Sequence, residues 1–193
     1  MPEYKAKFAD HANELIAAAE EKPFVVFLFG PSLTSKQRAS VDLRRRLKEA
    51  LEAAKFEVVL GEDESVNNPT LKGIGINIQD SELEFARKYC NAIVLIADSV
   101  GSFCELGLFS WHFAHSEGVL SHLDFILLID KKHAPPPGSY LNQGPALAVH
   151  GHGLRLYEPF KKFDIDAVVS RLVARRGTYT VEQRGRPRVP KAQ

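Results

Sequence analysis

Short apolar runs alternate with amphipathic segments along most of the chain. Residues 24–29, 92–97 and 125–130 are apolar at nearly every position, which is typical of strands buried on both faces of a parallel sheet. Two shorter runs, 56–60 and 154–157, predict two more strands. Apolar residues at helical spacing predict helices between and around these strands. Those helices cover residues 5–20, 40–54, 81–90, 102–116 and 164–176, with a short one opening at 144–149.

The alternation of strands and helices predicts the fold class. We expect an α/β, flavodoxin-like or Rossmann-like three-layer sandwich with a five-stranded parallel sheet in the order 2-1-3-4-5. Ligands of such sheets bind in the crevice at the carboxyl ends of the first and third strands. The chain divides into an N-terminal helix (1–22), one α/β domain (23–177) and a mobile basic tail (178–193).

Composition narrows the functional classes. The 193 residues are 45% hydrophobic and 25% charged, with a formal net charge of +1, so neither a membrane nor a nucleic acid is expected as a partner. The N-terminus lacks the apolar core of a signal peptide, and no apolar run reaches the ~18–20 residues of a membrane span. Two cysteines, Cys90 and Cys104, are too few for a disulfide framework. We therefore expect a cytoplasmic protein.

Several local signals set the expected helix ends and the loop. Ser40 is expected to cap its helix, Ser81–Glu84 has the spacing of a capping box, and Gly177 is expected to end the last helix. The basic run Arg44–Arg46 is interpreted as a solvated helix face, with a phosphate clamp as the alternative. Residues 61–78 form a long polar loop, and such loops are often functional.

Two turns follow the first and third strands and should meet in the crevice. The first is Gly30-Pro31-Ser32, where the missing side chain lets a ligand approach the backbone. The second runs from Asp98 to Gly101 and leads into a helix. Glu105 is expected in the first turn of that helix, where the helix dipole favours an ionised carboxylate. Ser102 and Glu105 also have the spacing of a capping box, so helix capping alone would explain them.

These residues carry a resemblance to a known family. Leu28-Phe29-Gly30-Pro31-Ser32, together with the Ser-x-Gly-x-x-x-Glu-Leu-Gly pattern of residues 99–107, resembles the nucleoside 2-deoxyribosyltransferase-like superfamily. The second pattern is most similar to the branch of nucleoside 5′-monophosphate N-glycosidases. The resemblance covers about residues 24–130 and implies cleavage of a base–sugar bond.

The resemblance also implies residue roles. Glu105 would attack C1′ as the nucleophile, and Asp98 would orient the sugar or assist proton transfer. Ser99, Gly101 and Ser102 would hold a 5′-phosphate. The remaining implied substrate contacts are Gly30, Pro31 and Ser32 around the sugar, Asp80 as a further acidic residue, and Asn142 as a donor from a late loop. The substrate is a nucleoside, a nucleotide or an NAD-like molecule, and hydrolysis and base transfer both stay open.

No cofactor or metal is expected, since His112 and His115 lack a third ligand. A homodimer is expected, because the family builds shared pockets and Trp111 and Phe113 would supply apolar helix surface. Two other functions remain open. One is a TIR-like NADase acting as an immune effector. The segment Ser99–Glu105 could match the strand-end serine, the cysteine and the glutamate of such enzymes. The other is a non-enzymatic nucleotide sensor. A lysine-decarboxylase-like phosphoribohydrolase is disfavoured because its Pro-Gly-Gly-x-Gly-Thr turn is absent.

Overall fold

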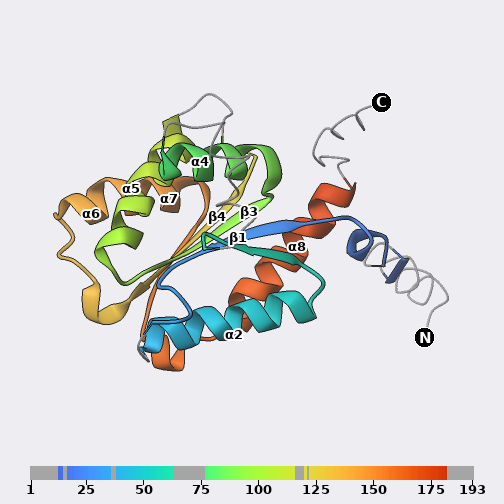
Figure 1. Cartoon of the computed structure of the whole chain (residues 1–193), viewed down its shortest axis with the longest axis horizontal. Helices are drawn as coiled ribbons and strands as arrows, with labels where there is room; N and C mark the ends of the chain where they lie inside the picture. Colours follow the sequence, from blue (N-terminus) through green and yellow to red (C-terminus); the bar gives the residue numbers. More distant parts are fainter. Residues whose placement is uncertain are drawn as a thin grey trace, which may run out of the picture.

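The computed structural model describes residues 13–14, 17–35, 38–62, 77–115, 120 and 122–181. Its centre is a five-stranded sheet in the order β2-β1-β3-β4-β5, and every neighbouring pair is parallel (Figure 1). The strands are β1 (Val25–Phe29), β2 (Glu57–Leu60), β3 (Ala92–Ala97), β4 (Asp124–Asp130) and β5 (Leu154–Glu158). The predicted fold class and strand order are confirmed.

Helices cover both faces of the sheet (Figure 1). One face carries α4 (Ile78–Tyr89), α5 (Val100–His115) and α7 (Pro145–His152), and the other carries α2 (Ala39–Ala53) and α8 (Asp166–Val181). The short elements are α6 (Tyr140–Gln143) and the 3-10 turns η1 (Lys131–His133) and η2 (Phe160–Lys162). Two short helices, α6 and α7, therefore stand where the sequence predicted one.

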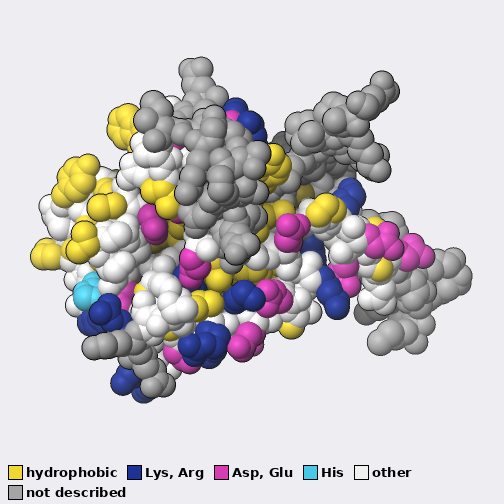
Figure 2. Space-filling model, in the orientation of Figure 1, with side chains coloured by type: hydrophobic (Ala, Val, Ile, Leu, Met, Phe, Trp, Pro, Cys, Tyr) yellow, Lys and Arg dark blue, Asp and Glu magenta, His cyan; other side chains and the backbone are white. Residues whose placement is uncertain are grey.

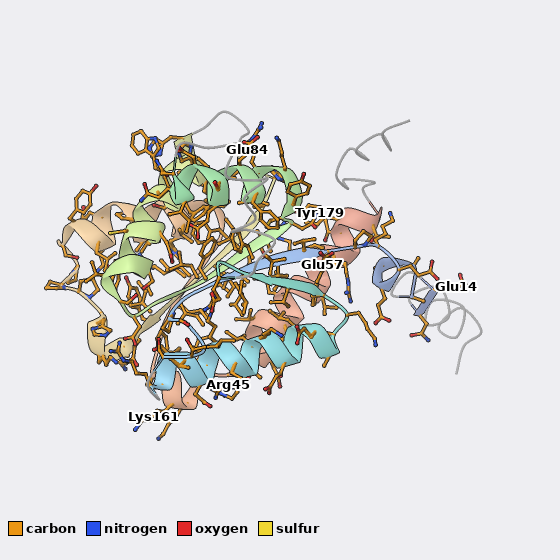
Figure 3. All side chains as sticks on the ribbon, viewed as in Figure 1. Glu14, Arg45, Glu57, Glu84, Lys161 and Tyr179 are labelled. Carbon is orange, nitrogen blue, oxygen red and sulfur yellow. The ribbon has the colours of Figure 1, made fainter. Side chains whose placement is uncertain are left out.

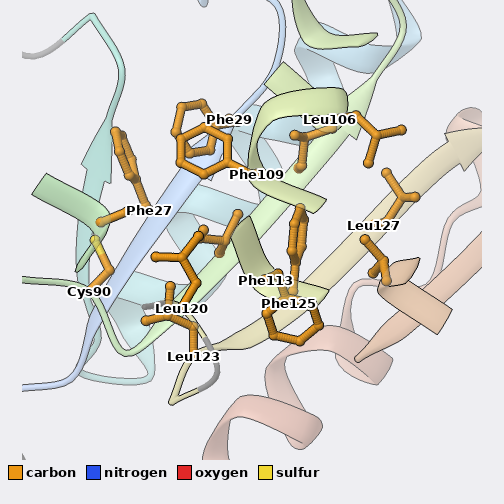
Figure 4. Close-up of a cluster of buried hydrophobic side chains, with 14 of the residues drawn as sticks. Phe27, Phe29, Cys90, Leu106, Phe109, Phe113, Leu120, Leu123, Phe125 and Leu127 are labelled. Atoms are coloured by element: carbon orange, nitrogen blue, oxygen red, sulfur yellow. The ribbon is translucent and has the colours of Figure 1, made fainter. Parts of the chain in front are cut away.

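Alternate residues of the apolar strands point to opposite faces, so the sheet has two cores. Phe27, Phe29 and Phe125 pack with Phe109 and Phe113 of α5 (Figure 4). On the other face the central strands pack against the leucines of α2 and against α8. Phe113 is only 5% exposed, so the expectation that it supplies surface for a dimer is wrong.

Three predicted helix ends are wrong. The residue before α2 is Arg38, which makes no capping hydrogen bond, and Ser40 lies inside the helix. Asn77 caps α4 by accepting from the amide of Asp80, so the helix begins before the predicted capping box at Ser81. Helix α8 continues through Gly177 to Val181, because a glycine on a helix surface weakens the helix by only about 1 kcal/mol.

Helix α8 is anchored at the amino-terminal ends of the strands. Arg171 makes two hydrogen bonds of 2.8 and 2.6 Å to the carboxylate of Asp124, the fully buried first residue of β4. The hydroxyl of Tyr179 donates to the backbone carbonyl of His122 beside it. The last turns of the helix therefore lie at the edge of the sheet opposite to the crevice.

Some predictions fall on residues outside the described ranges. They are most of the N-terminal helix, the loop residues 63–76, the last residue of the helix predicted at 102–116, and residues 182–193 of the tail. Residues 17–20 are helical, as predicted. Within the described ranges, no helix combines the length and apolarity needed to cross a bilayer.

Candidate functional site

The crevice that the sequence predicts between the ends of β1 and β3 is a closely packed region built around a glycine. Gly30 follows β1 with a φ of +149°, a backbone conformation that favours glycine. A Cβ there would come within 3.1 Å of the Ile96 Cβ and 3.5 Å of the Arg44 Cδ. Close packing between two strand ends and a helix thus accounts for the glycine that the sequence had suggested for ligand approach.

Arg44 of α2 is buried in this crevice, so the interpretation of Arg44–Arg46 as a solvated face is wrong for its first member. Its side chain is 1% exposed and donates to the backbone oxygens of Leu28 and Pro31 at 2.7 and 3.0 Å. Two further hydrogen bonds, of 2.7 and 2.8 Å, join it to the carboxylate of Glu62 after β2. Arg45 points outward from α2 into solvent (Figure 3).

Glu105 stands in the second turn of α5, because the helix begins at Val100. Its predicted place in the first turn, next to the helix dipole, is therefore wrong. Its Oε2 atom is buried and has no hydrogen-bond partner among the described residues. Burial raises the pKa of Glu105, the nearby Arg44 guanidinium lowers it, and the Glu62 carboxylate raises it again, with a net increase. A buried, unpaired carboxylate oxygen costs free energy, which is a mark of a functional position.

A second carboxylate, Glu82 of α4, belongs to the same site. It is 8% exposed, and a Cβ at Gly61 would come within 3.2 Å of its Oε1. Burial, followed by repulsion from the Glu105 charge, raises the pKa of Glu82 to about 7. The site therefore holds two carboxylates that do not favour being ionised together.

Asp98 lies at the end of β3 with both carboxylate oxygens occupied. Oδ2 accepts from the Ser40 hydroxyl at 2.6 Å, and Oδ1 lies 2.9 Å from His133 Nε2 and 3.3 Å from Lys132 Nζ. Burial alone would raise the pKa of Asp98, but the hydrogen bonds from Ser40, His133 and Lys132 outweigh it and the pKa is lowered. Asp98 therefore stays ionised and links α2, β3 and η1.

Ser99 and Ser102 bond to each other at the start of α5. The Ser102 hydroxyl accepts from the backbone amides of Asp98 and Ser99 at 3.0 and 2.9 Å and donates to the Ser99 carbonyl. The Ser99 hydroxyl accepts from the Ser102 amide at 3.2 Å. These bonds form a reciprocal helix cap and already use the hydroxyls that the sequence assigned to a phosphate. Gly101 is exposed beside them.

The other predicted residues lie in local turns or in a different hollow. The Ser32 hydroxyl bonds to Thr34 in an exposed turn next to Pro31. Asp80 lies in the first turn of α4, two residues before Glu82, so the two carboxylates point in different directions from the helix. Asn142 of α6 bonds to the Tyr157 hydroxyl and to the Pro135 carbonyl. Its hollow shares no lining residue with the Glu105 crevice.

Helical spacing in the sequence could have located the residues that were missed. Ser40 and Arg44 lie on the α2 face that also carries Leu47 and Leu51, and Glu82 lies four residues before the buried Ala86. Polar residues in line with a buried stripe point into the protein. In the described part of the chain, no three His, Cys, Asp or Glu side chains gather as a metal site would require.

A comparison with family models finds one match. The model described as STM3845 retron effector protein matches residues 40–184, which is well over half of the chain and includes the crevice residues Arg44, Glu82 and Glu105. No curated protein matches the chain.

Proposed function

The chain belongs to the STM3845 retron effector protein family, whose role is defence-related, and on that premise we propose that it is an N-glycosidase that cleaves the base–sugar bond of a nucleotide. The observation that supports this most directly is Glu105. Its Oε2 is buried and has no hydrogen-bond partner among the described residues, and it lies near the strand ends where sheets of this type bind ligands. Cleavage of a nucleotide would deplete a pool that an invading replicating element needs.

Glu105 is proposed as the nucleophile. In its ionised form Oε2 attacks C1′ of the sugar, and the bond from C1′ to the base nitrogen breaks. The electrons of that bond leave with the base. Arg44 assists because its guanidinium favours the ionised form of Glu105 in a buried setting. Water, or a second base, then attacks C1′ and releases Glu105 as a carboxylate.

Glu82 is proposed as the proton donor. Two carboxylates whose environments push their pKa values apart can act as base and acid in one site. Glu82, with a pKa of about 7, is about half protonated at neutral pH. The pKa of Glu105 is also raised by burial, but the Arg44 guanidinium opposes that increase and favours the ionised form. The Glu82 proton would go to the departing base, and the water of the second step would return one. This assignment moves the acidic role from Asp80 to Glu82.

NAD is a second candidate substrate, because the defence-related family agrees with the immune-effector reading of the Ser99–Glu105 segment. Nicotinamide leaves its ribose as a neutral molecule and needs no proton. The same nucleophile therefore suffices for NAD, whereas a purine or pyrimidine gains from protonation by Glu82.

The test is a mass-spectrometric screen for released bases. The purified protein is incubated with NAD and with each common ribo- and deoxyribonucleoside monophosphate. We expect base release that falls by roughly four orders of magnitude in Glu105→Gln. Glu84→Gln is the matched control, since Glu84 bonds to Arg87 on the outer side of α4 (Figure 3). Equal turnover in Glu105→Gln and the control would refute the mechanism, and free nicotinamide alone would select the NADase.

A further inference from the structure

A hollow opens beside η1, which follows the carboxyl end of β4. It has a volume of about 500 Å³ and is bounded by η1, α6, α7 and β5. Pockets for small molecules commonly have volumes of about 300–1,000 Å³. None of its lining residues belongs to the Glu105 crevice, so it has no role in the chemistry proposed above.

Two cations line this hollow without a carboxylate partner. Lys131 comes from η1 and Arg155 from β5, and neither makes an ion pair in the part of the chain that the structure describes. Two other basic residues differ from them, since Lys132 of η1 faces Asp98 and Arg44 of α2 faces Glu62. The guanidinium of Arg155 lies 5.3 Å from the centre of the Tyr157 ring, which holds it on the wall by a cation–π contact.

The rest of the wall is mainly apolar. Pro135, Leu147 and the Tyr157 ring contribute the surface, and Leu147 is 50% exposed. The wall is also held in place. The Tyr157 hydroxyl donates to Asn142 Oδ1 at 2.6 Å, and Asn142 Nδ2 donates to the Pro135 carbonyl at 2.9 Å. A rigid apolar wall with two unpaired cations suits a ligand that has a planar ring and a negative charge.

We propose that this hollow binds a small anion with a planar ring, of the size and chemistry of a nucleoside monophosphate. The phosphate lies between Lys131 and Arg155, and the base lies against Pro135, Leu147 and Tyr157. We assign the hollow as an effector site rather than a second site of base–sugar cleavage, because no carboxylate is among the described residues that line it.

The turn η1 connects the hollow to Asp98, so a ligand in the hollow can affect the crevice. Lys131 faces the hollow, while the next two residues, Lys132 and His133, contact the Asp98 carboxylate at the end of β3. A ligand that holds Lys131 therefore restricts the turn that also holds Asp98. Occupancy of the hollow should change the rate of any reaction at Glu105.

The test is a titration of the isotope-labelled full chain followed by NMR. The Glu105→Gln background removes turnover, and the probes are AMP, GMP, CMP, UMP, adenosine and inorganic phosphate. At least one monophosphate should shift the amides of residues 131–143 and 154–157. It should bind at least tenfold more tightly than adenosine or phosphate alone.

Three variants check the location. Lys131→Ala/Arg155→Ala should weaken binding of that monophosphate at least tenfold, and Leu147→Asp should weaken it by placing a negative charge at the rim without disturbing the fold. Arg45→Ala, an outward cation of α2, should bind like the parent. The proposal is overturned if no monophosphate shifts these amides at millimolar concentration, or if the Lys131/Arg155 variant binds as the Arg45 variant does. Loss of activity in Glu105→Gln is a separate result and affects only the proposed reaction.

Discussion

Arg44 donates two hydrogen bonds to the Glu62 carboxylate, and the charges of this ion pair act on the carboxylate of Glu105. The two partners act on Glu105 in opposite directions. Arg44 favours its ionised form and Glu62 opposes it. The pair therefore sets how much positive charge the nucleophile experiences, and Glu62 reduces it.

The first prediction concerns the acid limb of the pH–rate profile, which reports ionisation of Glu105. Glu62→Gln removes a negative charge, so the pKa of Glu105 should fall and the limb should move to lower pH by about one unit. Arg44→Met should move it to higher pH. The measurement is kcat/KM for base release as a function of pH. If the acid limbs of Glu62→Gln and Arg44→Met move in the same direction, Glu105 is not the ionising group.

The second prediction separates the two carboxylates by the leaving group. Glu82→Gln should slow base release from a nucleoside monophosphate by about 100-fold or more, since general acid catalysis contributes about 10²–10⁴-fold. Release of nicotinamide from NAD should change far less, because nicotinamide leaves without a proton. Parallel assays on both substrates check this, with Asp80→Asn as the control on the same helix. An equal loss on both substrates excludes Glu82 as the proton donor.

The third prediction concerns stability and pH. Glu82 has an ordinary pKa near 4.5 when unfolded and about 7 when folded, so between these values the folded state binds more protons. The free energy of unfolding must then fall as pH rises from about 4.5 to 7. The stabilisation that protonated Glu82 gives the folded state is fully present only below about pH 4.5. Glu82→Gln removes the penalty.

Urea unfolding at pH 5 and pH 8 measures this effect. From pH 5 to pH 8 the free energy of unfolding should fall more in the parent than in Glu82→Gln. The pKa shift corresponds to a difference of up to about 3 kcal/mol, and partial hydration of the site makes it smaller. The control is Glu84→Gln. A parent and a Glu82→Gln variant with the same pH dependence would show that the Glu82 carboxyl titrates normally.

The fourth prediction is a homodimer through α5. Val100, Cys104 and Trp111 lie exposed along one side of this helix, with Trp111 stacked on His115 at 4.1 Å. Figure 2 shows hydrophobic side chains gathered where α5 and α6 reach the surface. Light scattering at micromolar concentration should give the mass of two chains. Trp111→Glu should weaken association at least tenfold, whereas Glu84→Gln should not; a monomer at every concentration contradicts the prediction.

The sheet could be predicted because its signal is local and repeated. The apolar run Ala92–Ala97 leaves few alternatives to a central strand, and short connections between alternating elements allow few topologies. Helix ends were less predictable, since several residues near Ser40 and Ser81 could act as caps. The choice between them depends on tertiary contacts, such as the one that takes the Ser40 hydroxyl to Asp98.

The candidate site could be predicted only in part. Motif spacing pointed to Glu105, and none of the residues that the structure describes makes a hydrogen bond to its Oε2. Arg44, Glu62 and Glu82 come from three other segments, and their meeting depends on how α2, β2 and α4 pack. The spacing of residues within one segment cannot predict contacts between segments that are far apart in the sequence. The serines after β3 show the converse, because the same hydroxyls that suit a phosphate also suit the helix cap they form.

The anchoring of α8 by Asp124 and His122 has a practical outcome. That helix ends beside the amino-terminal ends of the strands, whereas Glu105 and the hollow beside η1 follow the carboxyl-terminal ends of β3 and β4. A linker joined after Val181 would therefore emerge on the far side of the molecule from Glu105 and the hollow. The protein can be immobilised on a sensor chip through such a linker with both sites turned toward the flowing solution.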